Sequence, residues 1–278
     1  MVALTSRKLK QQKVKTLLAS PEPTYDWLIP GLLERTDRVI ITGREGKGKS
    51  TLLRQIGYRL SIGQHPFTGA ATPNVTVVYF DLENSVRQYR RACNRLKAVS
   101  PGFDSEMVVV NEPEGLNVTK DRSPAESILE EHHPDLVILG PMYKLAPDLI
   151  KEDESARVAA VLDSWRAKYN CAIIMESHQP HEANVAGEGR YRPERPFGSS
   201  LWLRWPEFGY CLEDSGVLRP WRGPREERDW PEKLRRGEAS EWPWMLDVRR
   251  CLNCNEPVEG NKRFCDDDCE DEYKKRGR

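Results

Sequence analysis

A phosphate-loop signature at residues 43–51 is the feature that most restricts how this chain can fold. The segment GREGKGKST matches the pattern G-x-x-x-x-G-K-[ST] and directly follows the apolar run from Arg38 to Thr42. In such a loop, glycines let backbone N–H groups face a phosphate, and the start of the next helix adds its dipole. The sequence therefore predicts a strand, a phosphate-binding loop and a helix from Lys49 to about Ser61.

The same loop predicts ATP and Mg²⁺ as cofactors. Lys49 is expected to bridge the β- and γ-phosphates, which places it among the catalytic residues, and the Ser50 hydroxyl is expected to bind Mg²⁺. The predicted nucleotide-binding residues are Gly43, Arg44, Glu45, Gly46, Lys47, Gly48, Lys49, Ser50 and Thr51.

Further apolar runs alternate with helical segments along the chain. Four of them follow the loop: Val75–Phe80, Met107–Val110, Leu136–Leu139 and Ala172–Met175. Strands that are buried on both faces have continuous apolar sequences, so we predict an α/β fold with a mostly parallel twisted sheet flanked by helices. Two more strands, around Glu207 to Leu212 and Val217 to Pro220, are expected to extend this sheet as a hairpin.

Polar residues at the ends of these strands are the catalytic candidates, because parallel strands deliver them to one edge of the sheet. Glu83 is the predicted general base, although an acid at a helix N-terminus would have the same sequence position. The acid usually found after a run such as LVIL is replaced by Gly140. Asp81 is therefore a candidate, though a weaker one, to bind Mg²⁺ in its place. His178 is either a sensor of the γ-phosphate or a structural residue.

Four cysteines near the C-terminus have the spacing of metal ligands. Cys251-x₂-Cys254 and Cys265-x₃-Cys269 are separated by ten residues, which predicts a tetrahedral Zn²⁺ site. The predicted organisation is a basic segment at 1–22, a nucleotide-binding domain at 23–221, an irregular arm at 222–247 and a zinc module at 248–278.

Composition restricts the function only slightly. The 43 Lys and Arg residues balance 43 Asp and Glu residues, so net charge indicates no class of partner. The basic ends, Ser6–Lys15 and Lys274–Arg278, fit either contact with nucleic acid or solvated tails. No apolar stretch approaches the roughly 18 residues that cross a bilayer. The charged N-terminal segment is also not followed by the apolar core of a signal peptide. We therefore expect a cytoplasmic protein with no membrane partner.

Six landmarks together resemble the RecA-like ATPases, and specifically the RepA-type hexameric helicases of phages and plasmids, the AAA_25-like group. They span Asp26 to Leu212: WLIPGLL, GREGKGKST, VYFDLEN, PDLVILGPMYKL, ESHQP and FGSSLW. The resemblance implies a homo-oligomeric ring, ATP between subunits and single-stranded DNA in a central pore, in a bacterial or phage-infected cell. Replication proteins are predicted as possible partners of the zinc module. The resemblance also matches Glu83 to the catalytic glutamate, His178 to the sensor, and Gly187–Ser200 to the DNA-facing loop.

The resemblance makes an ATP-driven DNA motor, a replicative helicase or a helicase loader, the leading hypothesis. The alternative is a RecA-like recombination or regulatory ATPase that binds nucleic acid without unwinding it. An arginine finger from a neighbouring subunit is expected, with Arg222, Arg225 and Arg228 as candidates and a solvated charged arm as the competing interpretation. The DNA-binding candidates are Arg190, Arg192 and Arg195, of which Arg190 and Arg195 are also possible fingers. Trp202 and Trp205 are either base-stacking or core residues.

Overall fold

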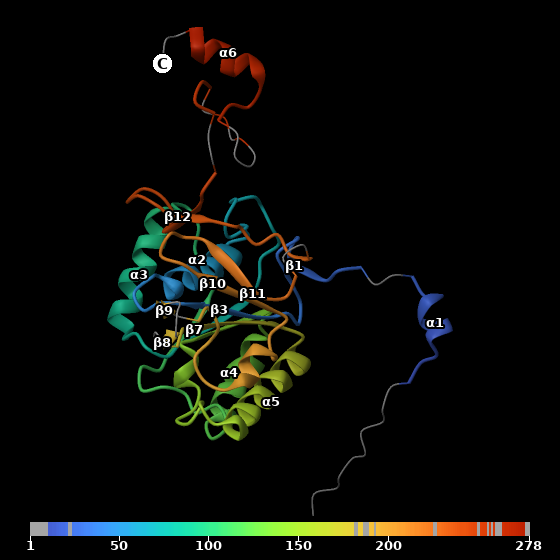
Figure 1. The fold of residues 1–278 in the computed structure, drawn as a ribbon. Helices are drawn as coiled ribbons and strands as arrows, with labels where there is room; N and C mark the ends of the chain where they lie inside the picture. The colour runs from blue at the N-terminus through green and yellow to red at the C-terminus, as the bar shows by residue number, and fades with distance from the viewer. Residues whose placement is uncertain are drawn as a thin grey trace, which may run out of the picture.

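A seven-stranded sheet forms the centre of the molecule (Figure 1). The computed structural model describes residues 11–21, 24–180, 183–185, 189–191, 193–224, 227–248, 251–254, 256, 258 and 263–275, with only the backbone for 183–185 and 189–191. The strand order is β11-β10-β3-β7-β6-β4-β5, in which β11 is antiparallel to β10 and the other neighbours are parallel. The predicted α/β fold with a mostly parallel sheet is confirmed.

The strands of this sheet fall on the predicted apolar runs. Their bounds are β3 Arg38–Gly43, β4 Val77–Asp81, β5 Val108–Asn111, β6 Leu136–Gly140, β7 Ala172–His178, β10 Phe208–Leu212 and β11 Leu218–Arg222. Every residue of β4, β6 and β10 is buried. Side chains alternate between the two faces, so Val39 and Ile41 of β3 join one core while Ile40 joins the other.

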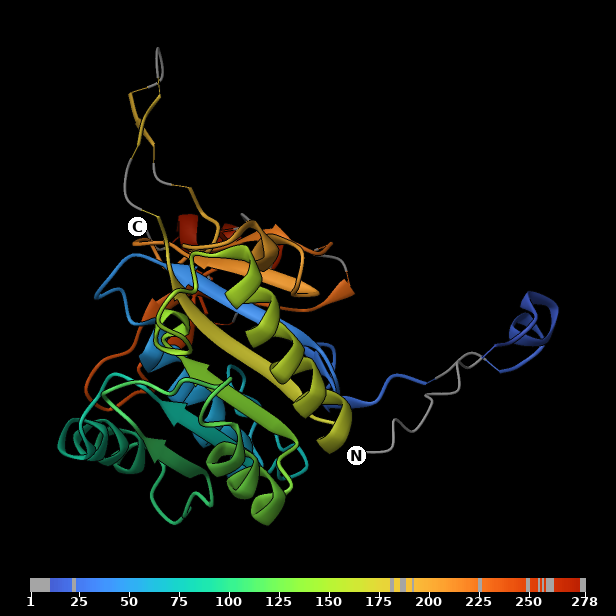
Figure 2. The ribbon, with the colours of Figure 1, turned by 90° about the horizontal axis from the view of Figure 1, so that it is seen from below.

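Helices cover both faces of the sheet (Figures 1 and 2). α2 (Lys49–Ser61) and α3 (Val86–Ala98) lie together on one face, and α4 (Arg122–His132) and α5 (Glu152–Tyr169) lie on the other. Ser85 and Gln88 form a capping box that begins α3. Within the described part of the chain, no helix is both long and apolar enough to cross a membrane.

Residues 222–247, predicted as an irregular arm, contain a short antiparallel hairpin. β12 (Leu234–Arg236) pairs with β13 (Trp244–Leu246), and the hairpin lies against α2. The Gln55 side chain accepts from the Trp244 backbone N–H at 2.8 Å and donates to the Trp244 carbonyl at 2.7 Å. The arm is therefore more ordered than predicted, because α2 supplies backbone-like hydrogen bonds to a strand of three residues.

The remaining elements are small. They are α1 Val14–Leu18, β1 Trp27–Ile29, β2 Leu33–Glu34, η1 Met142–Lys144, β8 Ala183–Val185, β9 Gly189–Tyr191, η2 Ser200–Leu203 and α6 Asp267–Lys275. β8 and β9 form an antiparallel hairpin that projects from the body of the molecule (Figure 2). Trp202 and Trp205 are buried core residues, which excludes base stacking on their rings.

Candidate functional site

The phosphate loop joins the end of β3 to the start of α2, as the sequence predicts. Gly48 precedes α2 with φ of +84°, a left-handed conformation that a residue with a Cβ adopts only under strain. The Lys49 side chain is 4% exposed, and its Nζ donates to the carbonyls of Gly43 and Arg44 at 3.0 and 2.9 Å. The loop therefore holds a buried cation at the N-terminus of a helix, which is an arrangement suited to bind phosphate.

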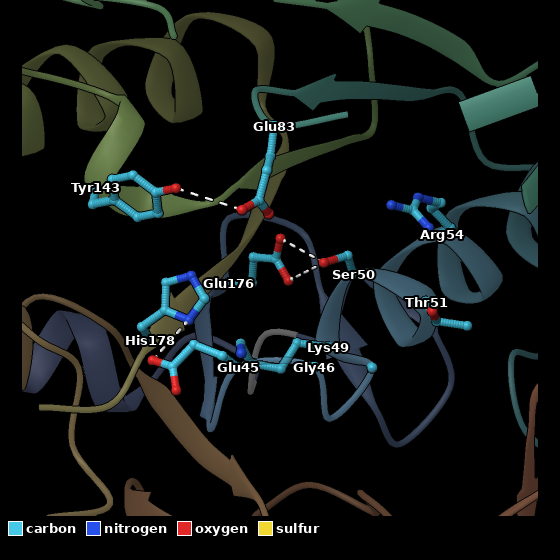
Figure 3. A pocket seen from close by; sticks show the side chains of 11 residues that line it. Glu45, Gly46, Lys49, Ser50, Thr51, Arg54, Glu83, Tyr143, Glu176 and His178 are labelled. Carbon is cyan, nitrogen blue, oxygen red and sulfur yellow. Dashed lines mark hydrogen bonds and ion pairs between the residues drawn. The ribbon is translucent and has the colours of Figure 1, made fainter. Parts of the chain in front are cut away.

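A cavity of about 510 Å³ opens over this loop (Figure 3). Its lining combines loop residues with side chains from three neighbouring strand ends: Glu45, Gly46, Gly48, Lys49, Ser50, Thr51, Arg54, Glu83, Tyr143, Glu176 and His178. The structure thus brings the predicted residues Lys49, Ser50, Glu83 and His178 to one cavity. Of the other predicted loop residues, Arg44 faces a separate hollow beside Leu212 and Asp214, and Lys47 pairs with Asp214 at 2.9 Å.

Glu83 and His178 stand on the wall of the cavity opposite α2 (Figure 3). Glu83 is exposed, and its Oε1 accepts from the Tyr143 hydroxyl at 3.5 Å. The His178 ring lies 5.5 Å from that of Tyr143, and its Nδ1 is 3.6 Å from a carboxylate oxygen of Glu45. An accessible carboxylate that lines the same cavity as Lys49 is placed where a general base can contact water.

Asp81, the candidate for Mg²⁺, does not line the cavity. Its Oδ1 accepts from the backbone N–H groups of Glu83 and Asn84 at 3.2 and 2.9 Å, and the Asn84 amide bonds both carboxylate oxygens. Arg54 also lies 3.6 Å from Oδ2. These partners occupy both oxygens, so the structure gives Asp81 a role in shaping the turn that leads to Glu83.

Glu176 lines the cavity but was not among the residues predicted from the sequence, and the same is true of Arg54 and Tyr143. Glu176 is 3% exposed, and both of its carboxylate oxygens lie 2.9 Å from the Ser50 hydroxyl, which donates to them. Burial raises the pKa of Glu176 to about 7, against the opposing effects of Lys49, the Ser50 hydrogen bond and Arg54. The sequence does contain an acid at the polar end of the segment AIIMES, which could have marked Glu176 as a candidate. Its position next to Ser50, however, depends on the packing of β7 beside β3.

The arginine candidates differ in exposure. Arg222 and Arg195 are exposed, as a residue that reaches into a neighbouring subunit must be. Arg228 is 7% exposed and bonds both oxygens of Asp37 at 3.0 Å, with Glu34 at 3.3 Å. Arg228 therefore lacks the freedom that an arginine finger needs. Other candidates, and the ends of both basic tails, fall outside the described residues or side chains: Arg190, Arg192, Arg225, residues 6–10 and residues 276–278.

The C-terminal cysteines gather into one cluster. The sulfurs of Cys251, Cys254, Cys265 and Cys269 all lie within 4.8 Å of one another, and those of Cys254 and Cys265 are 3.6 Å apart. Tetrahedral coordination with Zn–S bonds of about 2.3 Å places sulfurs roughly 3.8 Å apart. Burial raises the pKa of Cys251, but hydrogen bonds from backbone N–H groups of the cluster outweigh this effect and lower the pKa to about 6, which favours the thiolate. The donor set therefore fits a tetrahedral metal ion.

Together, the parallel sheet, the phosphate loop and the strand-end acids define a RecA-like P-loop ATPase. The chain belongs to the AAA_25 family, described as an AAA domain, whose model matches residues 4–184. Its fold is similar to that of a KaiC-like protein from the hyperthermophilic archaeon Pyrococcus horikoshii OT3, with a TM-score of 0.52 and 17% identity over 80% of this chain and 95% of that one. No curated protein matches the chain significantly.

Proposed function

We propose that this protein is an ATP-driven motor on single-stranded DNA, a replicative helicase or helicase loader of a bacterial or phage-infected cell. One observation carries the proposal: β7 places His178 at the nucleotide cavity and continues within a few residues into the projecting β8–β9 hairpin (Figure 2). A strand that lines the cavity and leads into the hairpin can transmit the state of the γ-phosphate to a segment that contacts another molecule.

ATP hydrolysis would use the residues of the cavity in separate roles. Lys49 would neutralise charge on the β- and γ-phosphates, and Glu83 would orient the attacking water. Mg²⁺ bound at Ser50 supplies charge neutralisation of the phosphates. An arginine from the neighbouring subunit, for which the exposed Arg222 and Arg195 are suited, would stabilise the transition state in a homo-oligomer, which we propose to be a hexameric ring.

DNA contact is assigned to the hairpin and the segment that follows it. Arg190 lies within β9, and Arg192 and Arg195 follow it in the sequence. Arginines in and after a projecting hairpin would bind a phosphate backbone, so we expect binding with little sequence preference and a strong salt dependence.

The cysteine cluster is proposed to bind Zn²⁺ and to contact a replication protein. Asp266, Asp267 and Asp268 are exposed at the start of α6, beside the cluster. This local negative charge opposes contact with a phosphate backbone, which favours a protein partner for this module.

Strand displacement on a forked DNA duplex tests the motor directly. Wild type is expected to unwind the fork only with ATP, and Lys49→Ala is expected to lose both unwinding and hydrolysis because the phosphates lose their buried cation. Lys168→Ala is the matched control, since Lys168 is exposed at the end of α5 and pairs with Glu130 at 2.6 Å.

Two other outcomes would contradict this proposal. DNA-stimulated hydrolysis without unwinding would indicate the alternative, a recombination or regulatory ATPase of the same fold. Hydrolysis that does not respond to DNA at all would exclude the whole class of DNA motors.

A further inference from the structure

The position that usually carries the metal-side acid in this kind of site is a glycine here. Gly140 is the last residue of β6, at the carboxyl edge of the sheet. Its φ is not positive, so Gly140 does not adopt the left-handed conformation that favours glycine. Backbone conformation therefore does not require glycine at this position, and another reason must be found for it.

Space supplies that reason. A Cβ added to Gly140 would lie 2.5 Å from Cγ of Glu176 and 2.8 Å from its Oε1. Real Cβ atoms do not approach other heavy atoms so closely, so any side chain at residue 140 would displace Glu176. The Glu176 side chain on β7 thus fills the volume that a side chain at residue 140, on the adjacent strand β6, would need.

Glu176 has the contacts that a metal-side acid needs. Its two oxygens face the Ser50 hydroxyl at 2.9 Å, and the group lines the same cavity as Lys49 (Figure 3). The other nearby acids are placed differently. Asp81 is held by Asn84, the turn amides and Arg54, whereas Glu83 is exposed on the opposite wall and bonded to Tyr143.

We infer that Glu176, delivered by β7, takes the metal-side role of the acid missing at Gly140, and that Gly140 is required because it leaves room for this carboxylate. Glu176 would hold waters of the Mg²⁺ that Ser50 binds, while Glu83 remains free to orient the attacking water. The inference rests on the proposed ATPase function and assigns different tasks to two glutamates of one cavity.

Metal affinity, measured without turnover, tests this assignment. Mn²⁺ replaces Mg²⁺, and its affinity for the full chain with a non-hydrolysable ATP analogue is measured by electron paramagnetic resonance. Glu176→Gln is expected to weaken Mn²⁺ binding about tenfold or more. Analogue affinity in EDTA should stay unchanged or rise, because the substitution removes a negative charge beside the phosphates. A damaged fold would instead lower both affinities.

A reciprocal exchange provides the sharper test. Glu176→Ala alone should lose Mn²⁺ affinity, because the carboxylate is gone. The double variant, Gly140→Asp with Glu176→Ala, should recover about tenfold relative to Glu176→Ala, since an acid then stands on β6 in the vacated space. Such a recovery does not depend on how well either single variant folds.

Two results would overturn the inference: unchanged Mn²⁺ affinity in Glu176→Gln, or a double variant no better than Glu176→Ala. In the first case, a loss of Mn²⁺ affinity in Asp81→Asn would return the role to Asp81. If the wild type fails to bind the analogue at all, the proposed ATPase function is wrong, and this failure is distinct from the other two.

Discussion

At the scale of single residues, Glu83 is the group on which turnover is predicted to depend. Its carboxylate is exposed at the cavity and is oriented by the Tyr143 hydroxyl at 3.5 Å. Replacement by Gln keeps the size of the side chain and removes the base, so we expect kcat for ATP hydrolysis to fall by about 10² or more. Affinity for ATP should change little, because Lys49 and the loop provide the binding.

Steady-state hydrolysis together with equilibrium binding of a fluorescent ATP analogue separates these two effects. Glu112→Gln is the matched control, since Glu112 is exposed just after β5 at the same edge of the sheet and does not line the cavity. A Glu83→Gln variant with unchanged kcat would show that another group activates the water.

Most residues of this cavity were predicted from the sequence, whereas the predicted Asp81 does not line it and the unpredicted Glu176 does. Loop residues Lys49 and Ser50 are recognisable because their spacing follows from the geometry of one turn. Asp81 and Glu176 both end apolar runs, and their sequence positions do not distinguish them. Only the packing of β7 between β3 and β6 shows which carboxylate faces Ser50.

At the scale of elements, the β12–β13 hairpin is predicted to stabilise the phosphate loop. Trp244 is 2% exposed, its indole N–H donates to the Gly48 carbonyl at 3.1 Å, and Arg236 stacks on its ring at 3.8 Å. Trp244→Ala should lower the free energy of unfolding by about 3 to 5 kcal/mol, because it leaves a large cavity in the core. ATP affinity should fall as well, since the loop loses an anchor.

Trp244→Phe separates packing from hydrogen bonding in this contact. The phenyl ring keeps most of the buried surface and loses the N–H, so we expect a loss of about 1 kcal/mol. Chemical denaturation of both variants measures the difference. Unchanged stability and unchanged ATP affinity in Trp244→Ala would show that the hairpin does not support the loop.

Long buried elements were predictable, and this hairpin was not. β3, β6 and β7 are continuous apolar runs because helices cover both faces of a parallel sheet. β12 and β13 have three residues each, too few to show a period, and they lie among charged and tryptophan residues. Their pairing depends on Gln55 of α2, a contact across 189 residues of sequence that no local pattern contains.

At the scale of the whole molecule, the ATPase fold and the cysteine cluster have different sources of stability. Two apolar cores on the faces of the sheet hold the ATPase fold. Around the cysteines, by contrast, α6 has no buried residue, and the apolar contacts include the packing of Phe264 against Tyr273. A segment with so little core needs another source of folding free energy, which a metal ion bound by four thiolates would supply.

Metal removal should therefore unfold the C-terminal module and leave the ATPase fold intact. We expect the purified chain to contain stoichiometric zinc. A strong chelator should collapse the amide resonances of residues 251–275 while the main thermal transition stays within about 2 °C, because no described residue of the module belongs to the apolar cores of the ATPase fold. Cys265→Ser should have the same effect without chelator, and Cys93→Ser, outside the cluster on α3, should retain the zinc. A module that remains folded without metal would require a core that its described residues do not contain.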